Sequence, residues 1–182
     1  MLPEPPLVGR ALALAAELGF EKSSSPETGR LLHLLAAQRG RERVGEIGTG
    51  TGVGTAWLAA GLPPGVPLYT AEPEAGQARA AAELFAGDPD VHVLHGPWRE
   101  VLPRRAPFDL VFYDGGGKRD PATEAEEVVS MLAPGGTVVL DDFRQNRVND
   151  PLREWWLGHP RLAGAELRVS PAEAVLVCVR AL

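Results

Sequence analysis

The sequence predicts an α/β fold in which a mostly parallel sheet of seven strands carries helices on both faces. From Arg43 onward, short apolar runs alternate with longer stretches of helical spacing, as in successive βαβ units. The runs are apolar at consecutive positions, as in Leu110-Val111-Phe112, which is typical of strands covered on both faces. The last two runs are separated only by a short turn at Ser170-Pro171. They therefore predict an antiparallel C-terminal hairpin.

Two helices are expected ahead of the sheet. Leu7–Leu18 is apolar with helical spacing and is closed by Gly19. A second helix begins at Pro26, after a serine run suited to an N-cap, and ends near Gly40. At 182 residues, the length favours one domain. We expect it over residues 1–182, with a helical extension over 1–40 and the sheet core over 41–182.

The elements of the core follow in order. The expected parallel strands are Arg43–Ile47, Pro67–Glu72, Val91–His95, Phe108–Tyr113 and Thr137–Asp141. The expected helices between them are Gly52–Ala60, Pro73–Ala86, Trp98–Leu102 and Thr123–Leu132. A helix over Asp150–Leu157 and strands over Ala163–Val169 and Ala174–Val179 complete the chain.

Charge and composition exclude several classes of protein. A formal net charge of −6 does not suit binding to phosphate backbones, and we interpret the small patch of Arg99, Arg104 and Arg105 as solvated surface. No stretch approaches the roughly 18 uncharged apolar residues of a membrane span, and the N-terminus lacks the features of a signal peptide. The single cysteine, Cys178, excludes an intrachain disulfide. We therefore expect a cytoplasmic protein without a nucleic-acid or membrane partner.

A glycine-rich loop follows the first expected strand. It contains Gly48-Thr49-Gly50-Thr51-Gly52, preceded by Glu46 and followed by a helix with Thr55 in its first turn. Glycines there let the backbone approach a ligand at a helix N-terminus. The dinucleotide pattern G-x-G-x-x-G and the phosphate-loop pattern both fail, so E-x-G-x-G-x-G remains. A tight strand–helix turn without a ligand is the alternative interpretation.

The next two strands end in residues suited to a nucleoside. Glu72 lies 24 residues after Gly48, and a carboxylate there can accept hydrogen bonds from both ribose hydroxyls. The alternative is that Glu72 only caps the helix beginning at Pro73. After the third strand, Gly96-Pro97-Trp98 offers a close turn and an aromatic ring suited to adenine.

Carboxylates follow the fourth and fifth strands. Asp114 ends one, and Asp141-Asp142 ends the other. Three carboxylates at one sheet edge are costly unless a cation neutralises them, and an all-oxygen set suits a hard ion such as Mg²⁺. The alternative is that they cap loops and face water. Lys118 is one of only two lysines. Lysine can lose a proton, whereas arginine cannot, so Lys118 is a candidate proton acceptor. The alternative is that a lysine stands at this position by chance.

From Glu27 to Phe143 these residues resemble a class I S-adenosylmethionine-dependent methyltransferase. More narrowly, the chain is similar to the cation-dependent O-methyltransferases typified by catechol and caffeoyl-CoA O-methyltransferases. The segments that carry the resemblance are Glu27–Leu32, Arg43–Thr55, Phe108–Asp114 and Leu132–Thr137. The resemblance implies the Rossmann-like methyltransferase fold, a seven-stranded sheet with an antiparallel final hairpin.

The resemblance also implies roles for the candidate residues. The cofactor S-adenosylmethionine is expected to contact Glu46, Gly48, Thr49, Gly50, Thr51, Gly52, Thr55, Glu72, Pro73, Gly96, Pro97, Trp98 and Asp114. The metal positions, expected to hold Mg²⁺, are Asp114, Asp141 and Asp142. The catalytic residues are expected to be Lys118, which would take the proton or stabilise the oxyanion, and Asp114. Two positions depart from the family: Asp142 stands where asparagine is usual, and Lys118 lies four residues after Asp114 where three is usual.

The expected function is methyl transfer to the oxygen of a small hydroxylated, catechol-like acceptor, assisted by a divalent cation. A metal-independent N- or O-methyltransferase and a non-catalytic S-adenosylmethionine-binding protein are the alternatives. The failed G-x-G-x-x-G pattern disfavours a dinucleotide oxidoreductase. The sequence does not identify the acceptor, and the apolar N-terminal helices are compatible with a homodimer.

Overall fold

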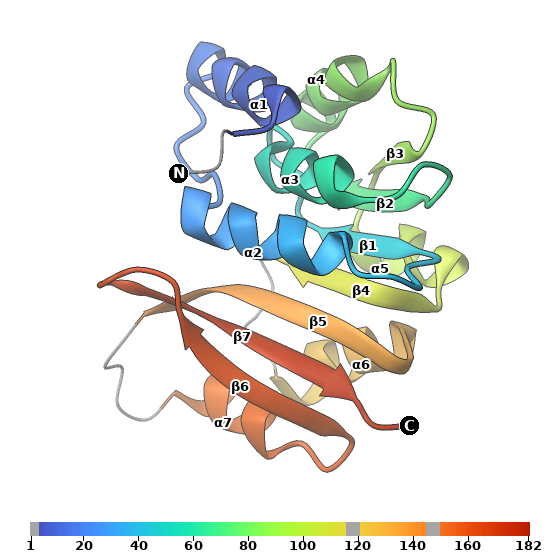
Figure 1. The fold of residues 1–182 in the computed structure, drawn as a ribbon, viewed down its shortest axis with the longest axis vertical. Coiled ribbons are helices and arrows are strands. Elements are labelled where there is room, and N and C mark those ends of the chain that lie inside the picture. The colour runs from blue at the N-terminus through green and yellow to red at the C-terminus, as the bar shows by residue number, and fades with distance from the viewer. Residues whose placement is uncertain (1–3, 116–120, 145–149) are drawn as a thin grey trace.

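The computed structural model describes residues 4–115, 121–144 and 150–182, and its strands form one twisted sheet (Figure 1). The sheet order is β3-β2-β1-β4-β5-β7-β6. The strands are β1 (Val44–Ile47), β2 (Leu68–Glu72), β3 (Val91–His95), β4 (Phe108–Tyr113), β5 (Leu132–Arg144), β6 (Leu162–Arg168) and β7 (Glu173–Arg180). Neighbouring strands from β3 to β5 pair in parallel. Strand β7 runs antiparallel to both β5 and β6, so the expected fold class is confirmed.

The helices lie close to their expected positions. They are α1 (Pro6–Glu17), α2 (Pro26–Ala36), α3 (Val53–Gly61), α4 (Ala75–Phe85), α5 (Trp98–Val101), α6 (Glu126–Met131) and α7 (Pro151–Gly158). The predicted N-cap before α2 is confirmed, because the Ser25 side chain accepts a hydrogen bond from the backbone N–H of Thr28. The expected helix Thr123–Leu132 is instead split into a π-helical turn, Pro121–Ala125, and the shorter α6.

The expected end of β5 at Asp141 is wrong, because the strand runs on to Arg144. Its pairing with β7 shifts register between Leu140 and Phe143, and Asp142 there has a positive φ of 70°. Such a bulge bends the strand and redirects side chains. The strand therefore continues beyond its last pair with β4, at Leu140, and stays paired with β7 as far as Arg144.

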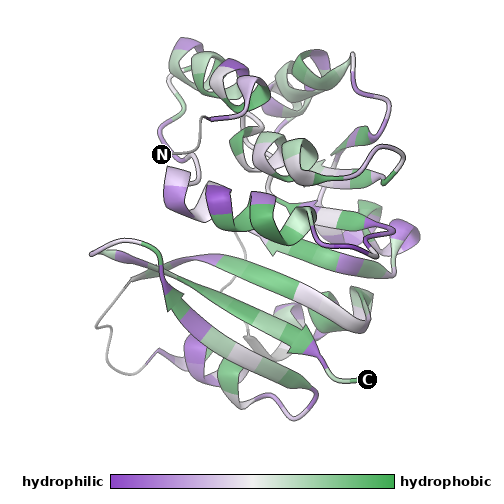
Figure 2. Ribbon diagram, in the orientation of Figure 1, coloured by the Kyte–Doolittle hydropathy of each residue, from purple (hydrophilic) through white to green (hydrophobic). Residues whose placement is uncertain are grey.

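Helices cover both faces of the sheet. Alternate residues of β4 belong to two separate clusters of buried side chains, since Val111 lies in one and Leu110 in the other. The first cluster includes side chains of α5, α6 and α7, and the second includes side chains of α1, α2, α3 and α4. Figure 2 shows the matching apolar colouring of the central strands. Side chains of α1 and α2 share a cluster with side chains of β1 and β4. The single domain over residues 1–182, with a helical extension over 1–40 and a sheet core over 41–182, stays a prediction.

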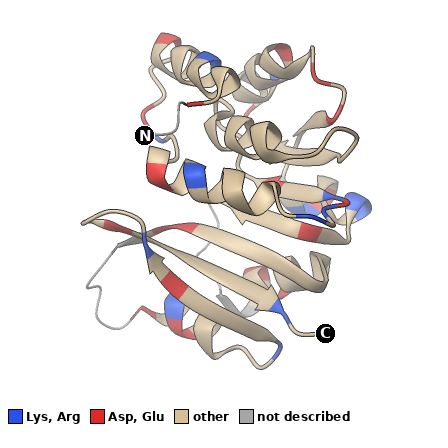
Figure 3. Cartoon of the chain, in the orientation of Figure 1, with Lys and Arg blue, Asp and Glu red and all other residues tan. Residues whose placement is uncertain are grey.

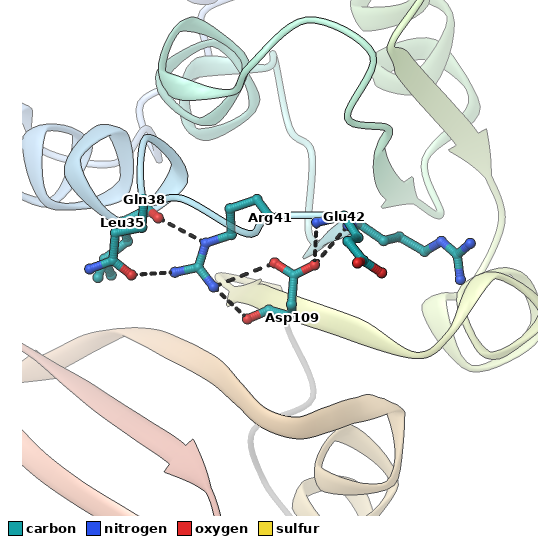
Figure 4. A network of polar contacts seen from close by, with 6 residues as sticks. Leu35, Gln38, Arg41, Glu42 and Asp109 are labelled. Atoms are coloured by element: carbon teal, nitrogen blue, oxygen red, sulfur yellow. Dashed lines mark hydrogen bonds and ion pairs between the residues drawn. The ribbon is translucent and has the colours of Figure 1, made fainter.

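A polar network fixes the start of the sheet at its amino-terminal edge (Figure 4). The Asp109 carboxylate accepts hydrogen bonds from the backbone N–H groups of Glu42, at 2.7 Å, and Arg43, at 2.8 Å. The Arg41 guanidinium donates to the carbonyl oxygens of Asp109 and Leu35 at 2.8 and 2.9 Å. The network therefore aligns β1 with β4 at the edge opposite the strands' carboxyl ends.

We expect Asp109→Ala to destabilise the protein without changing ligand binding at the opposite edge of the sheet. The substitution leaves two backbone donors without their acceptor, which costs about 2–3 kcal/mol. Urea unfolding measures the loss, and Glu42→Ala is the matched control. The Glu42 side chain is exposed, so its removal should change the unfolding free energy by less than about 0.5 kcal/mol. Equal stability of the two variants would contradict this role for Asp109.

Charged residues of both signs are spread over several elements in the view of Figure 3. Within the described part of the chain, no helix combines the length and the apolar character needed to cross a membrane. The absence of a nucleic-acid partner, the homodimer and the cytoplasmic location stay predictions.

Candidate active site

A pocket of about 950 Å³ lies at the carboxyl edge of the parallel strands. This volume is in the range typical of small-molecule sites, roughly 300–1,000 Å³. Its walls come from the segment before α2 (Phe20–Ser25), the loop after β1 (Ile47–Thr51), the end of β2 (Ala71–Pro73), the start of α5 (Pro97–Arg99), the end of β4 (Asp114 and Gly115) and the paired strands β5 and β7 (Asp141–Phe143 and Glu173). Ligands of open α/β sheets bind at this edge.

The glycine-rich loop forms one wall of the pocket with its backbone. The N–H groups of Gly48 and Thr49 donate to the carbonyl of Ala71 at 3.1 and 3.3 Å, which ties the loop to β2. Gly50 has a φ of 54°, and a Cβ atom there would lie 2.9 Å from the ring of Phe20. The segment before α2 therefore packs directly on the loop, and a side chain at position 50 would have to displace the ring of Phe20.

Glu72 links the loop to the next helix. One carboxylate oxygen accepts the N–H of Gly50 at 2.8 Å, and the other accepts the N–H of Glu74 at 3.0 Å. The side chain is 6% exposed and lines the pocket. A carboxylate oxygen can accept more than one hydrogen bond, so Glu72 can hold the loop and still receive hydroxyl groups of a ligand. The capping alternative is wrong, because α4 begins at Ala75 and Glu74, not Glu72, caps it.

Trp98 forms part of the pocket wall on the side of β3. The Arg99 guanidinium lies 5.0 Å from the centre of its ring, and Tyr113 lies 6.2 Å away, centre to centre. Arg99 is itself held by Glu124 at 3.1 Å and by Glu127 at 2.5 Å. Only 9% of Trp98 is exposed. A ligand in the pocket can therefore touch Trp98, but only a small part of its side chain is open to such a contact.

The three aspartates predicted to bind metal all line this pocket. Asp114 accepts a hydrogen bond from the Ser24 hydroxyl at 3.2 Å, and Asp141 accepts the N–H of Asp142 at 2.9 Å. Asp141 is buried, whereas Asp142 is exposed. Over the described ranges 4–115, 121–144 and 150–182, no group of three or more His, Cys, Asp or Glu side chains is arranged so that it could hold a metal ion. The three aspartates thus share a pocket but do not form a ligand group there.

Glu46, predicted to contact the cofactor, does not line the pocket. It is completely buried behind the loop, where its carboxyl accepts a hydrogen bond from the Thr55 hydroxyl. Burial raises the pKa of Glu46 to about 8, an increase that hydrogen bonds from Thr55 and Thr70 oppose and the nearby charges of Asp114 and Glu72 reinforce. At neutral pH the side chain is therefore mostly un-ionised.

The structure brings most of the predicted site residues to one pocket. Those that line it are Gly48, Thr49, Gly50, Thr51, Glu72, Pro73, Pro97, Trp98, Asp114, Asp141 and Asp142. Those described but outside the lining are Glu46, Gly52, Thr55 and Gly96. Lys118 lies outside the described residues.

Sequence analysis missed several parts of the lining. Phe20 and the serines before α2 belong to the wall, although the serines were interpreted only as a cap. Arg99 was interpreted as solvated surface, and Phe143 and Glu173 carried no motif. The position of Arg99 next to Trp98 was a signal in the sequence that Arg99 could line the same pocket. None existed for Glu173, because its place depends on the pairing of β7 with β5.

Comparisons with known proteins agree with this geometry. A family model described as a methyltransferase domain matches residues 46–143, just over half of the chain. A protein named as an O-methyltransferase in Mycobacterium sp. (strain JLS) is 34% identical over 146 residues, which cover 75% of this chain and 64% of that relative. The chain thus spans less than two thirds of the length of this curated relative.

Two solved structures share the fold along almost the whole chain. The O-methyltransferase TomG from Streptomyces achromogenes, determined in complex with SAM, is 25% identical with a TM-score of 0.83, covering 100% of this chain and 92% of that one. The O-methyltransferase from Bacillus cereus, in complex with SAH, is 24% identical with a TM-score of 0.82, covering 99% of this chain and 93% of that one. Because the Bacillus cereus protein is only 24% identical to this chain, its similarity shows a shared fold alone.

Proposed function

Because the chain belongs to the methyltransferase domain family, we propose that it transfers a methyl group from S-adenosylmethionine to a hydroxyl oxygen of a small acceptor. The observation that carries this proposal is the pocket at the carboxyl edge of the sheet. Its walls combine the glycine-rich loop, the Glu72 carboxylate and Trp98, which suit the methionine, ribose and adenine parts of one ligand.

The lining residues have distinct tasks in cofactor binding. Backbone groups of Gly48–Thr51 are proposed to hold the methionine part, because this loop opens into the pocket at the start of α3. Glu72 is proposed to accept the ribose hydroxyls, and Pro97 with Trp98 to border the adenine. Gly52, Thr55 and Gly96 are proposed to shape the loops behind these contacts, since they do not line the pocket.

Methyl transfer requires the acceptor oxygen to lie in line with the sulfonium methyl group that the cofactor supplies. The protein contributes mainly orientation, which can lower a barrier by about 7–11 kcal/mol. Asp114 directly follows β4, and the Ser24 hydroxyl donates a hydrogen bond to it. The Asp114 carboxylate can also accept a hydrogen bond from the hydroxyl group that is to be methylated, and so keep its oxygen in place. Lys118 is proposed to take up the proton of that hydroxyl.

The acceptor is proposed to be a small hydroxylated, catechol-like molecule. Besides the proposed cofactor residues, the pocket lining includes Ser24 and Phe143, which contribute a hydroxyl group and an aromatic ring. A flat ring with adjacent hydroxyls fits such a wall. The metal-independent N- or O-methyltransferase and the non-catalytic binding protein remain alternatives.

The divalent cation expected from the sequence does not fit the described side chains as a preformed site, so no step of the proposed reaction passes through it. Its requirement can be measured separately, by adding EDTA and then restoring Mg²⁺. A rate that falls with EDTA and recovers with Mg²⁺ would support the cation. A rate that EDTA leaves unchanged would support metal-independent transfer.

The proposed function is tested by incubating the protein with S-adenosylmethionine and a panel of catechols, phenols and amines. We expect S-adenosylhomocysteine to form together with an O-methylated catechol, both detected by mass spectrometry. Methylation of an amine alone would support the N-methyltransferase alternative. Tight cofactor binding without product from any acceptor would support a non-catalytic protein.

A further inference from the structure

Glu46 is an acidic side chain inside the protein that the proposed reaction does not use. It is fully buried on β1, and its Oε2 accepts the Thr55 hydroxyl. Its other oxygen, Oε1, is buried without a hydrogen-bond partner among the described residues. A Cβ atom on Gly54 would lie 2.6 Å from that oxygen, so Glu46 packs tightly against the start of α3.

The surroundings of Glu46 favour an un-ionised carboxyl. The charged groups that face it are Glu72 from β2 and Asp114 after β4, and both are acidic. The groups that hydrogen-bond to it from α3 and β2 are the neutral hydroxyls of Thr55 and Thr70. An ionised carboxylate enclosed in this way would be strongly disfavoured, whereas a neutral carboxyl needs fewer partners.

Two hydrogen-bonded paths connect Glu46 to the glycine-rich loop. One runs through Thr55 in the first turn of α3, just after the loop. The other runs through Thr70, whose hydroxyl lies 2.6 Å from that of Thr49. Thr49 is a lining residue of the pocket. Both ends of the loop are therefore anchored to one buried side chain that no ligand in the pocket can touch.

We propose that Glu46 is a positioning residue which, as a neutral carboxyl, holds the glycine-rich loop in its cofactor-binding shape through Thr55 and Thr70. The inference rests on the proposed function, since the loop must bind the cofactor for its shape to matter. Binding then requires the proton on Glu46, so cofactor affinity is lost as the pH rises through the pKa of this group.

The test is calorimetric titration with S-adenosylhomocysteine at several pH values between 6 and 9.5. It compares the wild type with Glu46→Gln, which mimics a neutral carboxyl, and with Glu46→Ala. We expect Glu46→Gln to bind within about threefold of the wild type at pH 7, and Glu46→Ala to bind at least about tenfold more weakly. Above pH 8 the wild type should lose about tenfold in affinity per pH unit relative to Glu46→Gln. The ligand's own amino group titrates equally in both measurements, so this ratio isolates Glu46.

Two results would overturn the proposal. One is a loss of more than about thirtyfold in Glu46→Gln at pH 7, which would indicate an anion that contacts the ligand. The other is a ratio of wild-type to Glu46→Gln affinity that does not change with pH.

If neither protein binds the ligand, the proposed function fails, and melting of the ligand-free proteins then tests whether Glu46 is neutral in the folded protein. The gain in melting temperature of Glu46→Gln over the wild type should then grow from pH 5 to pH 8, and a gain independent of pH would refute a neutral Glu46.

Discussion

Gly48→Ala is expected to abolish cofactor binding. Gly48 has a φ of 96°, a conformation that costs a residue with a side chain about 1–2 kcal/mol. In addition, an added Cβ atom would lie 2.7 Å from the Cα and 2.8 Å from the backbone nitrogen of Gly115. Because backbone cannot rotate away as a side chain can, the loops after β1 and β4 must separate. We expect the affinity for S-adenosylhomocysteine to fall at least about 100-fold.

Gly65→Ala is the matched control for this substitution. Gly65 has a similar φ of 85°, but no atom lies within 4 Å of its added Cβ. It therefore carries the same backbone strain without the close approach. The control should bind the cofactor like the wild type and lose only about 1–2 kcal/mol of stability. Circular dichroism must show that both variants fold, and full cofactor affinity in folded Gly48→Ala would contradict the role given to this contact.

Glu72→Ala is expected to produce the second large loss. The substitution removes the acceptors for the N–H groups of Gly50 and Glu74 as well as the proposed acceptor for ribose hydroxyls. Hydrogen bonds to a charged group contribute about 1.5–3 kcal/mol each, so the affinity for S-adenosylhomocysteine should fall about 100-fold or more. Calorimetric titration at pH 7 measures the loss.

Glu74→Ala serves as the control for Glu72→Ala. Glu74 is acidic and lies two residues away, but its carboxylate caps α4 by accepting the N–H of Gln77 at 2.9 Å, and it does not line the pocket. Its removal should lower stability slightly and change cofactor affinity less than about threefold. Equal losses of affinity in the two variants would show that the capping of α4, and not Glu72, governs binding.

The sequence predicted the strands and the glycine-rich loop well because both depend on local signals. Consecutive apolar residues mark strands such as β4, and glycines mark the loop after β1. The length of β5 was missed because Pro134-Gly135-Gly136 was interpreted as a turn that feeds the strand. In the structure Leu132 already pairs with Phe108, and the register then shifts before Thr137 pairs with Leu110. Long-range pairing thus keeps the strand together across residues that locally favour a break.

Side-chain direction was the other part that the sequence could not supply. Glu46 is the residue before the last of β1, and Glu72 is the last of β2. Both lie beside the loop, yet Glu46 is buried behind it and Glu72 lines the pocket. The partners that make this difference, Thr55 and Gly50, lie 9 and 22 residues away. The metal prediction depended in the same way on side-chain placement: Asp114, Asp141 and Asp142 line one pocket, but among the described residues they do not form a ligand group.

The central claim is that the pocket at the carboxyl edge of the sheet binds the nucleoside cofactor. Hydrogen–deuterium exchange of the wild type with and without S-adenosylhomocysteine tests it most directly. We predict protection of the amides of Gly48–Gly52 and of the segment around Trp98. Protection confined instead to the smaller pocket of about 220 Å³ between Leu62 and Val91, or no protection of the folded protein at saturating ligand, would contradict the claim.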